Sequence, residues 1–474
     1  MDKQFDELVR YVISFVERSI LNKNNDKTIL RQKTTPEKLM DKLPLTLQKD
    51  KLSSIQIIDI LEQIIENSVI TNHPYFMNQM FGKTRPISFI ADILIAVLNT
   101  SMYTFEVAPV FSLIEKEVIT KLGAKIWGTG IGDGVFTAGG SISNMNALFL
   151  ARQHHLEHAK QNGLFNEKPL AVFVSEQAHY SFTKGVNFLG FGLESLIKIK
   201  SKKNAQIDIK ELKKAILKSK EKGKTPLMLI GIAGTTISGS YDDIESLAQI
   251  AKENKMWFHV DAAYGGSLLF SERQKHHLKG IEHADSVSWN FHKIMGMSLS
   301  TSSFLTREKG LLNKAFSVDA GYLFHEDTYD YDLGQKSLRG GRRPDAFKLW
   351  LTWKYQGETG LTTHIEKLCN AADTMAALIQ KNPKIELFTQ PESTIVCFRY
   401  TDKITDINIL NQLNIKIRNT IFDEGKMIFN YARLNNAVYL RCVLLDPEFT
   451  PEQLQTIIDK VVQTGNILLT DTEI

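Results

Sequence analysis

The strongest constraint on the fold of this chain is a series of short apolar runs that alternate with amphipathic segments from about residue 120 onward. The intervening segments, such as IDIKELKKAILKSKEK and DDIESLAQIAKEN, carry apolar side chains at helical spacing. Continuous apolar strands separated by helices are typical of a parallel sheet covered on both faces, so the pattern predicts an α/β fold. The strand-like runs are LAVFVS (170–175), SLIKIK (195–200), PLMLIGIAG (226–234), MWFHVDAA (256–263) and DSVSWNF (285–291).

The pattern also predicts more than one domain, because 474 residues are too many for one compact core. Residues 1–70 are mainly helical and polar and carry no chemical motif. Residues 71–345 contain the sheet and form the predicted large domain. Residues 346–474 combine long helices with strands near TIVCFRY (394–400) and AVYLRCVLL (437–445), which indicates a smaller α+β domain.

Composition excludes several classes of protein. Lys and Arg exceed Asp and Glu by 57 to 53, which gives a net charge of +4 and argues against a nucleic-acid binder. Three cysteines without a CxxC pair argue against a structural zinc site or a disulfide framework, and they fit a reducing compartment. The apolar stretch 86–98 is interrupted by Asp92 and is too short to span a bilayer. We therefore expect a soluble, cytoplasmic protein with no nucleic-acid or membrane partner and no metal.

The first motif with a chemical meaning is FTAGGSISNMNALFLAR (136–152). Gly139, Gly140 and Ser141 precede an amphipathic helix that is predicted to begin near Ile142. Glycines let a backbone approach an anion, and a helix start offers unpaired N–H groups, so a phosphate would bind well there. The alternative is an ordinary glycine turn with a serine cap.

Two further motifs follow strand-like runs. In WFHVDAAYGG (257–266), Asp261 is predicted to lie at the carboxyl end of a strand, the edge that faces the ligand crevice in open α/β sheets. It could hold a protonated ring nitrogen, a metal, a ribose or a helix cap. In SVSWNFHKIMG, Lys293 follows the next run among apolar residues, which favours the neutral amine of Schiff-base chemistry. Most lysines are simply solvated, but an anion-binding helix start, a strand-end Asp and an apolar Lys together meet the needs of pyridoxal 5'-phosphate (PLP).

The same segments resemble the group II PLP-dependent amino-acid decarboxylases, in the branch of the glutamate and cysteine sulfinate decarboxylases. The resemblance runs from about residue 73 to the C-terminus. It implies the fold type I architecture of aspartate aminotransferase-like PLP-dependent transferases, with a mainly parallel sheet in the large domain. The matching segments are HPYFMNQMF (73–81), LNTSMYTFEVAPVF (98–111), GDGVFTAGGSISNM (132–145), SEQAHYS (175–181), GTT (234–236), HVDAAYGG (259–266) and NFHK (290–293).

The resemblance implies a role for each matching residue. Lys293 is the Schiff-base lysine, Asp261 pairs with the pyridine nitrogen, and His179 stacks on the ring. Tyr331, in YDLGQKS, protonates the substrate after carbon dioxide leaves. The other residues implied to hold the cofactor are Gly140, Ser141, Thr236, Ala263, Asn290, His292 and Ser302.

The resemblance also implies a substrate-binding set. Arg441, in VYLRCVLL, matches the arginine that grips a substrate carboxylate, and its alternative is a surface salt bridge. Phe81, Ser101 and Tyr103 match the cysteine sulfinate and aspartate branch, because the glutamate-preferring branch has a small residue and an Asn–Phe pair there. Gln79 completes the set. The implied reaction is decarboxylation of a small acidic amino acid; the alternatives are another PLP reaction on this fold or a different amino acid.

A homodimer is a further implication of the resemblance. Its active site would lie at the subunit interface, with Tyr331 and Ser302 contributed across it and the N-terminal helical segment packed on the partner. Lys83, beside Phe81, adds a cation near the pocket mouth or is simply solvated.

Overall fold

The computed structural model describes residues 3–21, 29–165, 167–318, 324 and 329–470. Its larger sheet has seven strands in the order β2-β8-β7-β6-β5-β3-β4. β8 runs antiparallel to both of its neighbours, and the other pairs are parallel, so the sheet is mainly parallel, as predicted. The strands are β2 (Asp133–Thr137), β3 (Leu170–Ser175), β4 (Leu196–Ile199), β5 (Thr225–Ile232), β6 (Trp257–Asp261), β7 (Ser286–Asn290) and β8 (Ser302–Thr306).

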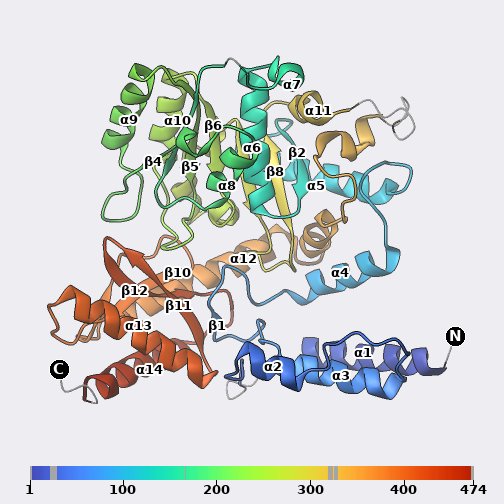
Figure 1. Cartoon of the computed structure of the whole chain (residues 1–474), viewed down its shortest axis with the longest axis vertical. Coiled ribbons are helices and arrows are strands. Elements are labelled where there is room, and N and C mark those ends of the chain that lie inside the picture. Colours follow the sequence, from blue (N-terminus) through green and yellow to red (C-terminus); the bar gives the residue numbers. More distant parts are fainter. Residues whose placement is uncertain (1–2, 22–28, 166, 319–323, 325–328, 471–474) are drawn as a thin grey trace.

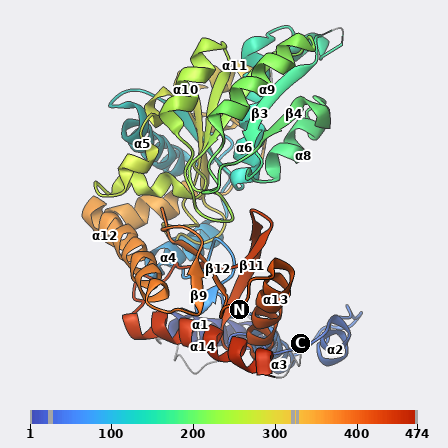
Figure 2. The same cartoon turned by 90° about the vertical axis from the view of Figure 1, so that its left-hand side faces the viewer.

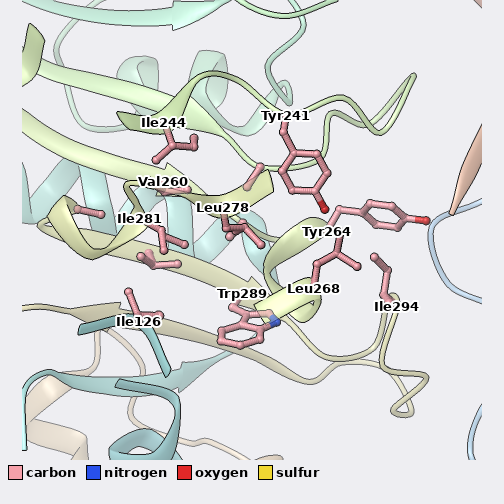
Figure 3. Close-up of a cluster of buried hydrophobic side chains, with 14 of the residues drawn as sticks. Ile126, Tyr241, Ile244, Val260, Tyr264, Leu268, Leu278, Ile281, Trp289 and Ile294 are labelled. Atoms are coloured by element: carbon pink, nitrogen blue, oxygen red, sulfur yellow. The ribbon is translucent and has the colours of Figure 1, made fainter. Parts of the chain in front are cut away.

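Helices cover both faces of this sheet because side chains along a strand alternate between the faces. On β3, Phe173 packs in one apolar cluster with α5, α9 and α10, whereas Val172 and Val174 pack in another with α6, α8 and α11. Figure 3 shows part of the first cluster, where Ile126 and Ile244 from the helices meet Val260 and Trp289 from the sheet. The helices are α5 (Pro109–Trp127), α6 (Gly140–His155), α7 (Ala159–Asn162), α8 (Ser181–Phe188), α9 (Ile209–Glu221), α10 (Ile244–Glu253) and α11 (Leu311–Phe316).

The smaller sheet has five strands in the order β1-β11-β12-β10-β9 and lies below the larger one in Figures 1 and 2. β1 (Phe76–Met77) pairs in parallel with β11, so a segment near residue 76 joins the C-terminal sheet. A third apolar cluster fills the space between this smaller sheet and the helices that cover it. The remaining elements are β9 (Ile385–Leu387), β10 (Ile395–Tyr400), β11 (Ile428–Leu434), β12 (Ala437–Val443), α12 (Ala346–Gln380), α13 (Ile407–Glu424) and α14 (Pro451–Thr470).

The N-terminal residues form a separate layer of helices beside the smaller sheet (Figure 1). α1 (Lys3–Leu21) packs against α3 (Ser54–Asn67), and α2 (Pro36–Lys42) lies between them in the sequence. α4 (Pro86–Leu98) then leads into the larger domain and packs against α12. No helix among the described residues is both long and apolar enough to cross a membrane.

Candidate active site

The two residues most strongly predicted to carry chemistry lie at one edge of the larger sheet. Asp261 is the last residue of β6, and Lys293 lies in the turn that follows β7. β6 and β7 are neighbouring parallel strands, with Asp261 opposite Ser288, so their carboxyl ends meet at the same edge. The Gly296 N–H donates to the Lys293 carbonyl at 3.0 Å and closes the turn. The strand-end positions of both residues were predicted correctly.

The predicted anion site lies at the start of α6. This helix begins at Gly140, two residues earlier than expected, and its N-cap Gly139 has a φ of 124°, which favours glycine. No side chain caps the helix, so the alternative of a serine cap is wrong. The Ile142 and Ser143 N–H groups donate to the Gly139 carbonyl. The N–H groups of Gly140 and Ser141 have no intrahelical partner and can bind an anion.

Asp261 is held by donors from three elements. Its Oδ2 accepts from Asn144 Nδ2 at 2.8 Å, and its Oδ1 accepts from the Ala263 N–H at 3.1 Å and Ser288 Oγ at 3.2 Å. A carboxylate surrounded by donors is oriented as an anion. This arrangement fits the partner of a protonated ring nitrogen better than a metal ligand.

Asn144 is the clearest site residue that the sequence analysis missed. It is buried in the first turns of α6, and its Oδ1 lies 3.3 Å from Nε2 of the buried His259. The spacing offered a signal, because Asn144 follows Ser141 by three residues and so lies on the same side of the helix. Its partner Asp261 is distant in the sequence, and only the fold brings them together.

The electrostatics of the pocket make Lys293 easier to deprotonate than an ordinary lysine. Lys293 is half-buried. Burial, and the nearby positive charge of Arg441, lower the pKa of its amine to about 8, although Asp261 opposes the shift. Burial also lowers the pKa of His179, which keeps that ring uncharged near neutral pH. A lysine with a lowered pKa is a better nucleophile toward a carbonyl group.

These groups line one cavity of about 200 Å³. Its walls are formed by the start of α6, the loops that follow β3 and β5, and the carboxyl ends of β6 and β7. The predicted cofactor residues that line it are Gly140, Ser141, His179, Thr236, Asp261, Ala263, Asn290, His292 and Lys293.

Residues 36–401 match the model of the pyridoxal-dependent decarboxylase conserved domain. The chain belongs to this family. It is 36% identical to the cysteine sulfinic acid decarboxylase of Mus musculus over 466 residues, which cover 96% of this chain and 94% of the relative. It is 34% identical to an acidic amino acid decarboxylase of Xenopus tropicalis over 91% of this chain and 87% of the relative. The crystal structure of mouse CSAD superposes with a TM-score of 0.93 at 34% identity, over 98% of this chain and 99% of that one.

The predicted fold type I architecture and the PLP cofactor are therefore confirmed, and the chain is a PLP-dependent carboxy-lyase. The residues present fit the cofactor. The buried Oδ1 of the Asn290 side chain has no hydrogen-bond partner among the described residues, and a Cβ at position 140 would lie 2.8 Å from the Nδ2 of the same side chain. Glycine thus leaves room for a ligand between this amide and the α6 start, where a phosphate would be bound.

Arg441 approaches the pocket from the smaller sheet. It is 7% exposed, so the alternative of a surface salt bridge is wrong. Its Nε donates to the Ile237 carbonyl at 3.1 Å and its Nη1 to the Asn78 carbonyl at 2.9 Å, while Nη2 is buried without a partner among the described residues. One arm of the guanidinium therefore remains available for a ligand carboxylate.

The loop after β1 carries the other residues on this side. Gln79 is exposed, and the half-buried Phe81 packs against Phe76 with ring centroids 5.9 Å apart. Neither residue lines the Lys293 cavity. Lys83 pairs with Asp446 at 2.8 Å and lines a different cavity. The sequence alone indicated a cation at the pocket mouth or a solvated lysine, and it predicted neither this ion pair nor this cavity.

A second group of predicted residues lies apart from the Lys293 cavity. It consists of Ser101, Tyr103 and Tyr331, and it is defined here as the distal group. The Tyr103 and Phe324 rings are tilted relative to each other, with centroids 5.2 Å apart, and Lys116 Nζ lies 3.9 Å from the centroid of the Tyr331 ring. Ser101 Oγ lies 3.4 Å from the Arg342 N–H.

Ser302 is also absent from the cavity lining, although it begins β8 and its Oγ lies 3.5 Å from His292 Nδ1. Of the segment between Phe324 and Tyr331, positions 325–328 lie outside the described residues.

Proposed function

We propose that this enzyme removes the α-carboxylate of a small acidic L-amino acid, with aspartate or cysteine sulfinate preferred to glutamate, and releases the amine and carbon dioxide. The observation that carries the proposal is the buried Arg441, whose charge lowers the pKa of Lys293 and whose Nη2, without a partner among the described residues, can bind a side-chain carboxylate or sulfinate. The names of the relatives, a cysteine sulfinic acid decarboxylase and an acidic amino acid decarboxylase, support it.

Each group in the pocket has a proposed task. PLP, when bound, supplies a conjugated ring that takes up the electron pair left on Cα as carbon dioxide departs. Asp261 keeps the ring nitrogen protonated, His179 stacks on the ring, and Lys293 holds the cofactor and then releases the product. The α6 start, with Asn290, binds the phosphate. Tyr331 returns a proton to Cα.

The proposed substrate preference rests on Phe81, Ser101 and Tyr103. Phe81 does not line the Lys293 cavity, but it follows by three residues Asn78, whose carbonyl binds Arg441 at 2.9 Å. In this proposal its bulky side chain limits the space beside Arg441, so a four-carbon acid fits better than a five-carbon one. One methylene is worth roughly 1–3 kcal/mol of discrimination, which corresponds to about 10- to 200-fold in kcat/KM.

A product assay tests the proposed function. The holoenzyme is incubated in parallel with aspartate, cysteine sulfinate, glutamate and an aromatic amino acid, and amine, carbon dioxide, aldehyde and ammonia are measured. We expect amine and carbon dioxide in equal amounts from aspartate or cysteine sulfinate. A preference for glutamate would refute the Phe81 argument, and aldehyde with ammonia would indicate oxidative decarboxylation. Other cleavage products would indicate a carbon–carbon lyase.

The Phe81→Ser variant tests the specificity residue directly. Enlarging the space should raise kcat/KM for glutamate relative to aspartate by about tenfold, near the lower limit for one methylene. Phe165→Ser, at a phenylalanine that is 87% exposed, is the matched control and should leave the ratio unchanged. If the ratio of kcat/KM for glutamate to that for aspartate did not change in Phe81→Ser, the Phe81 side chain would not determine which substrate length the enzyme prefers.

We also propose a homodimer with the active site at the interface between the subunits. The N-terminal segment (1–70) would pack on the partner. The larger domain would comprise residues 71–345 and the smaller domain residues 346–474. In a twofold dimer the distal group of one chain can complete the Lys293 pocket of the other. Exposed apolar side chains support an interface, because large apolar patches are rare on monomers. They include Val9, Val12 and Ile13 on α1, Ile93 and Val97 on α4, and Val110 on α5.

We place the enzyme in the cytoplasm; three free, buried cysteines fit a reducing compartment.

Complementation between inactive variants tests this arrangement. If Tyr331 acts across the interface, a hybrid of Lys293→Ala and Tyr331→Phe chains contains one intact site. A reassembled equal mixture should then regain about a quarter of wild-type activity, since half of the random dimers are hybrids with one of two sites intact. Each variant alone is the control. No recovery, with hybrids detected by native mass spectrometry, would show that Tyr331 acts within its own chain.

A further inference from the structure

A cavity of about 580 Å³ lies behind the turn that carries Lys293, and its lining shares no residue with the Lys293 pocket. It is bounded by the start of α4, the middle of α12 and residues 447–448. Two hydrogen bonds connect its walls to the Lys293 turn: the Arg85 N–H donates to the Gly296 carbonyl at 2.8 Å, and His364 Nε2 lies 3.0 Å from the Ile294 carbonyl. The charged and polar residues that line this cavity include Lys83, Arg85, Thr359, Thr363, His364 and Lys367.

Arg85 differs from the other buried arginines of the described residues. Arg342 is bound by Glu115 at 2.9 Å, and Arg441 donates to two carbonyl groups. Arg85 is 7% exposed, its side chain makes no hydrogen bond or ion pair among the described residues, and its Nη1 is buried without an acceptor. A buried charge without a counter-charge is costly, and the part of the chain that the structure describes supplies no acceptor for this guanidinium.

The nearby carboxylates already have partners. Asp446 binds Lys83 at 2.8 Å, and Glu448 binds Lys367 at 2.9 Å, so neither pairs with Arg85. Burial lowers the pKa of Arg85 to about 10, with no carboxylate to oppose the shift. The charge at the base of the cavity is therefore positive and uncompensated.

The rest of the lining suits an organic anion. Thr359 and Thr363 lie on the α12 wall, where Thr363 Oγ1 donates to the Thr359 carbonyl at 2.9 Å, and Pro86 and Pro447 supply apolar surface. A guanidinium binds a carboxylate through two parallel hydrogen bonds, and the prolines can contact a short carbon chain.

We propose that this cavity is a second ligand site, which binds a small organic carboxylate through Arg85 behind the Lys293 turn. The bound carboxylate supplies the acceptor that Arg85 lacks. The site is separate from Arg441 and from the catalytic pocket, so its existence does not depend on which substrate the enzyme decarboxylates.

Equilibrium dialysis of the holoenzyme against radiolabelled succinate, at constant ionic strength, measures the number of carboxylates bound per chain. Arg85→Gln should lose one equivalent, or weaken it by at least about tenfold, equivalent to ~1.4 kcal/mol. Arg433→Gln, at an exposed arginine of β11, is the matched control and should bind as the wild type does. Arg441→Gln identifies any succinate in the catalytic pocket, because that equivalent should be lost only in this variant.

A second pair of variants tests the site independently, in case Arg85→Gln fails to fold. Thr363 is exposed, so Thr363→Glu can place a carboxylate of the chain itself beside Arg85 and should abolish succinate binding in a folded enzyme. Thr363→Gln has the same size without the charge and should retain binding. Absence of binding in the wild type, loss only in Arg441→Gln, or equal binding in the two Thr363 variants would overturn the proposal. Equal displacement of succinate by chloride or phosphate would also overturn it, because the site would then be a general anion site.

Discussion

Replacing Lys293 by alanine is expected to remove the yellow chromophore that borohydride fixes to the protein and to lower kcat by at least about 10³-fold. The reason is that Lys293, whose pKa is lowered to about 8 by burial, is the proposed covalent link to the cofactor, and no other amine lines the pocket among the described residues. Absorbance spectra before and after borohydride, with mass analysis of the labelled peptide, provide the measurement.

The matched control is Lys384→Ala, which removes a partly buried lysine that pairs with Asp402 in the smaller domain. It should keep both chromophore and activity. If Lys293→Ala kept the fixable chromophore unchanged, the central assignment of this site would be wrong.

Replacing Asp261 by asparagine is expected to have the next largest effect, a loss in kcat of about 100-fold or more. Asparagine keeps the shape but removes the charge that holds the ring nitrogen protonated, and a hydrogen bond to a charged group is worth about 1.5–3 kcal/mol. It also turns one acceptor into an amide, opposite Asn144 Nδ2, where Asp261 now accepts at 2.8 Å. Single-turnover kinetics separate the decarboxylation step from product release.

Asp285→Asn is a suitable control for this prediction. Asp285 lies just before β7, at the opposite end of that strand, and accepts from the Phe258 N–H at 2.7 Å. It should change stability more than catalysis. If Asp261→Asn kept wild-type kcat with cofactor bound, the ring nitrogen would not depend on this carboxylate.

Several elements show what sequence patterns can predict. The buried strands β3 and β6 were predicted correctly because each is a mainly apolar run, and β7 was predicted from Val287 and Trp289, which alternate with polar residues. β2 and β8 were missed, since β8 has the sequence SSFLT and its serines are buried without an apolar signal. β1 was also missed, because two residues carry no periodicity.

Motif order and strand ends indicated a PLP site from the sequence, and the family resemblance supplied the decarboxylation. Lys293, Asp261 and the glycines before α6 are each fixed by local rules: a strand ends, a helix begins, and parallel neighbours share an edge. Tertiary structure decided which distant residues meet. It brought Asn144 to Asp261, left Arg85 without an acceptor, and separated the distal group from the Lys293 pocket. These features depend on packing between segments far apart in the chain, and local periodicity carries no information about such distances.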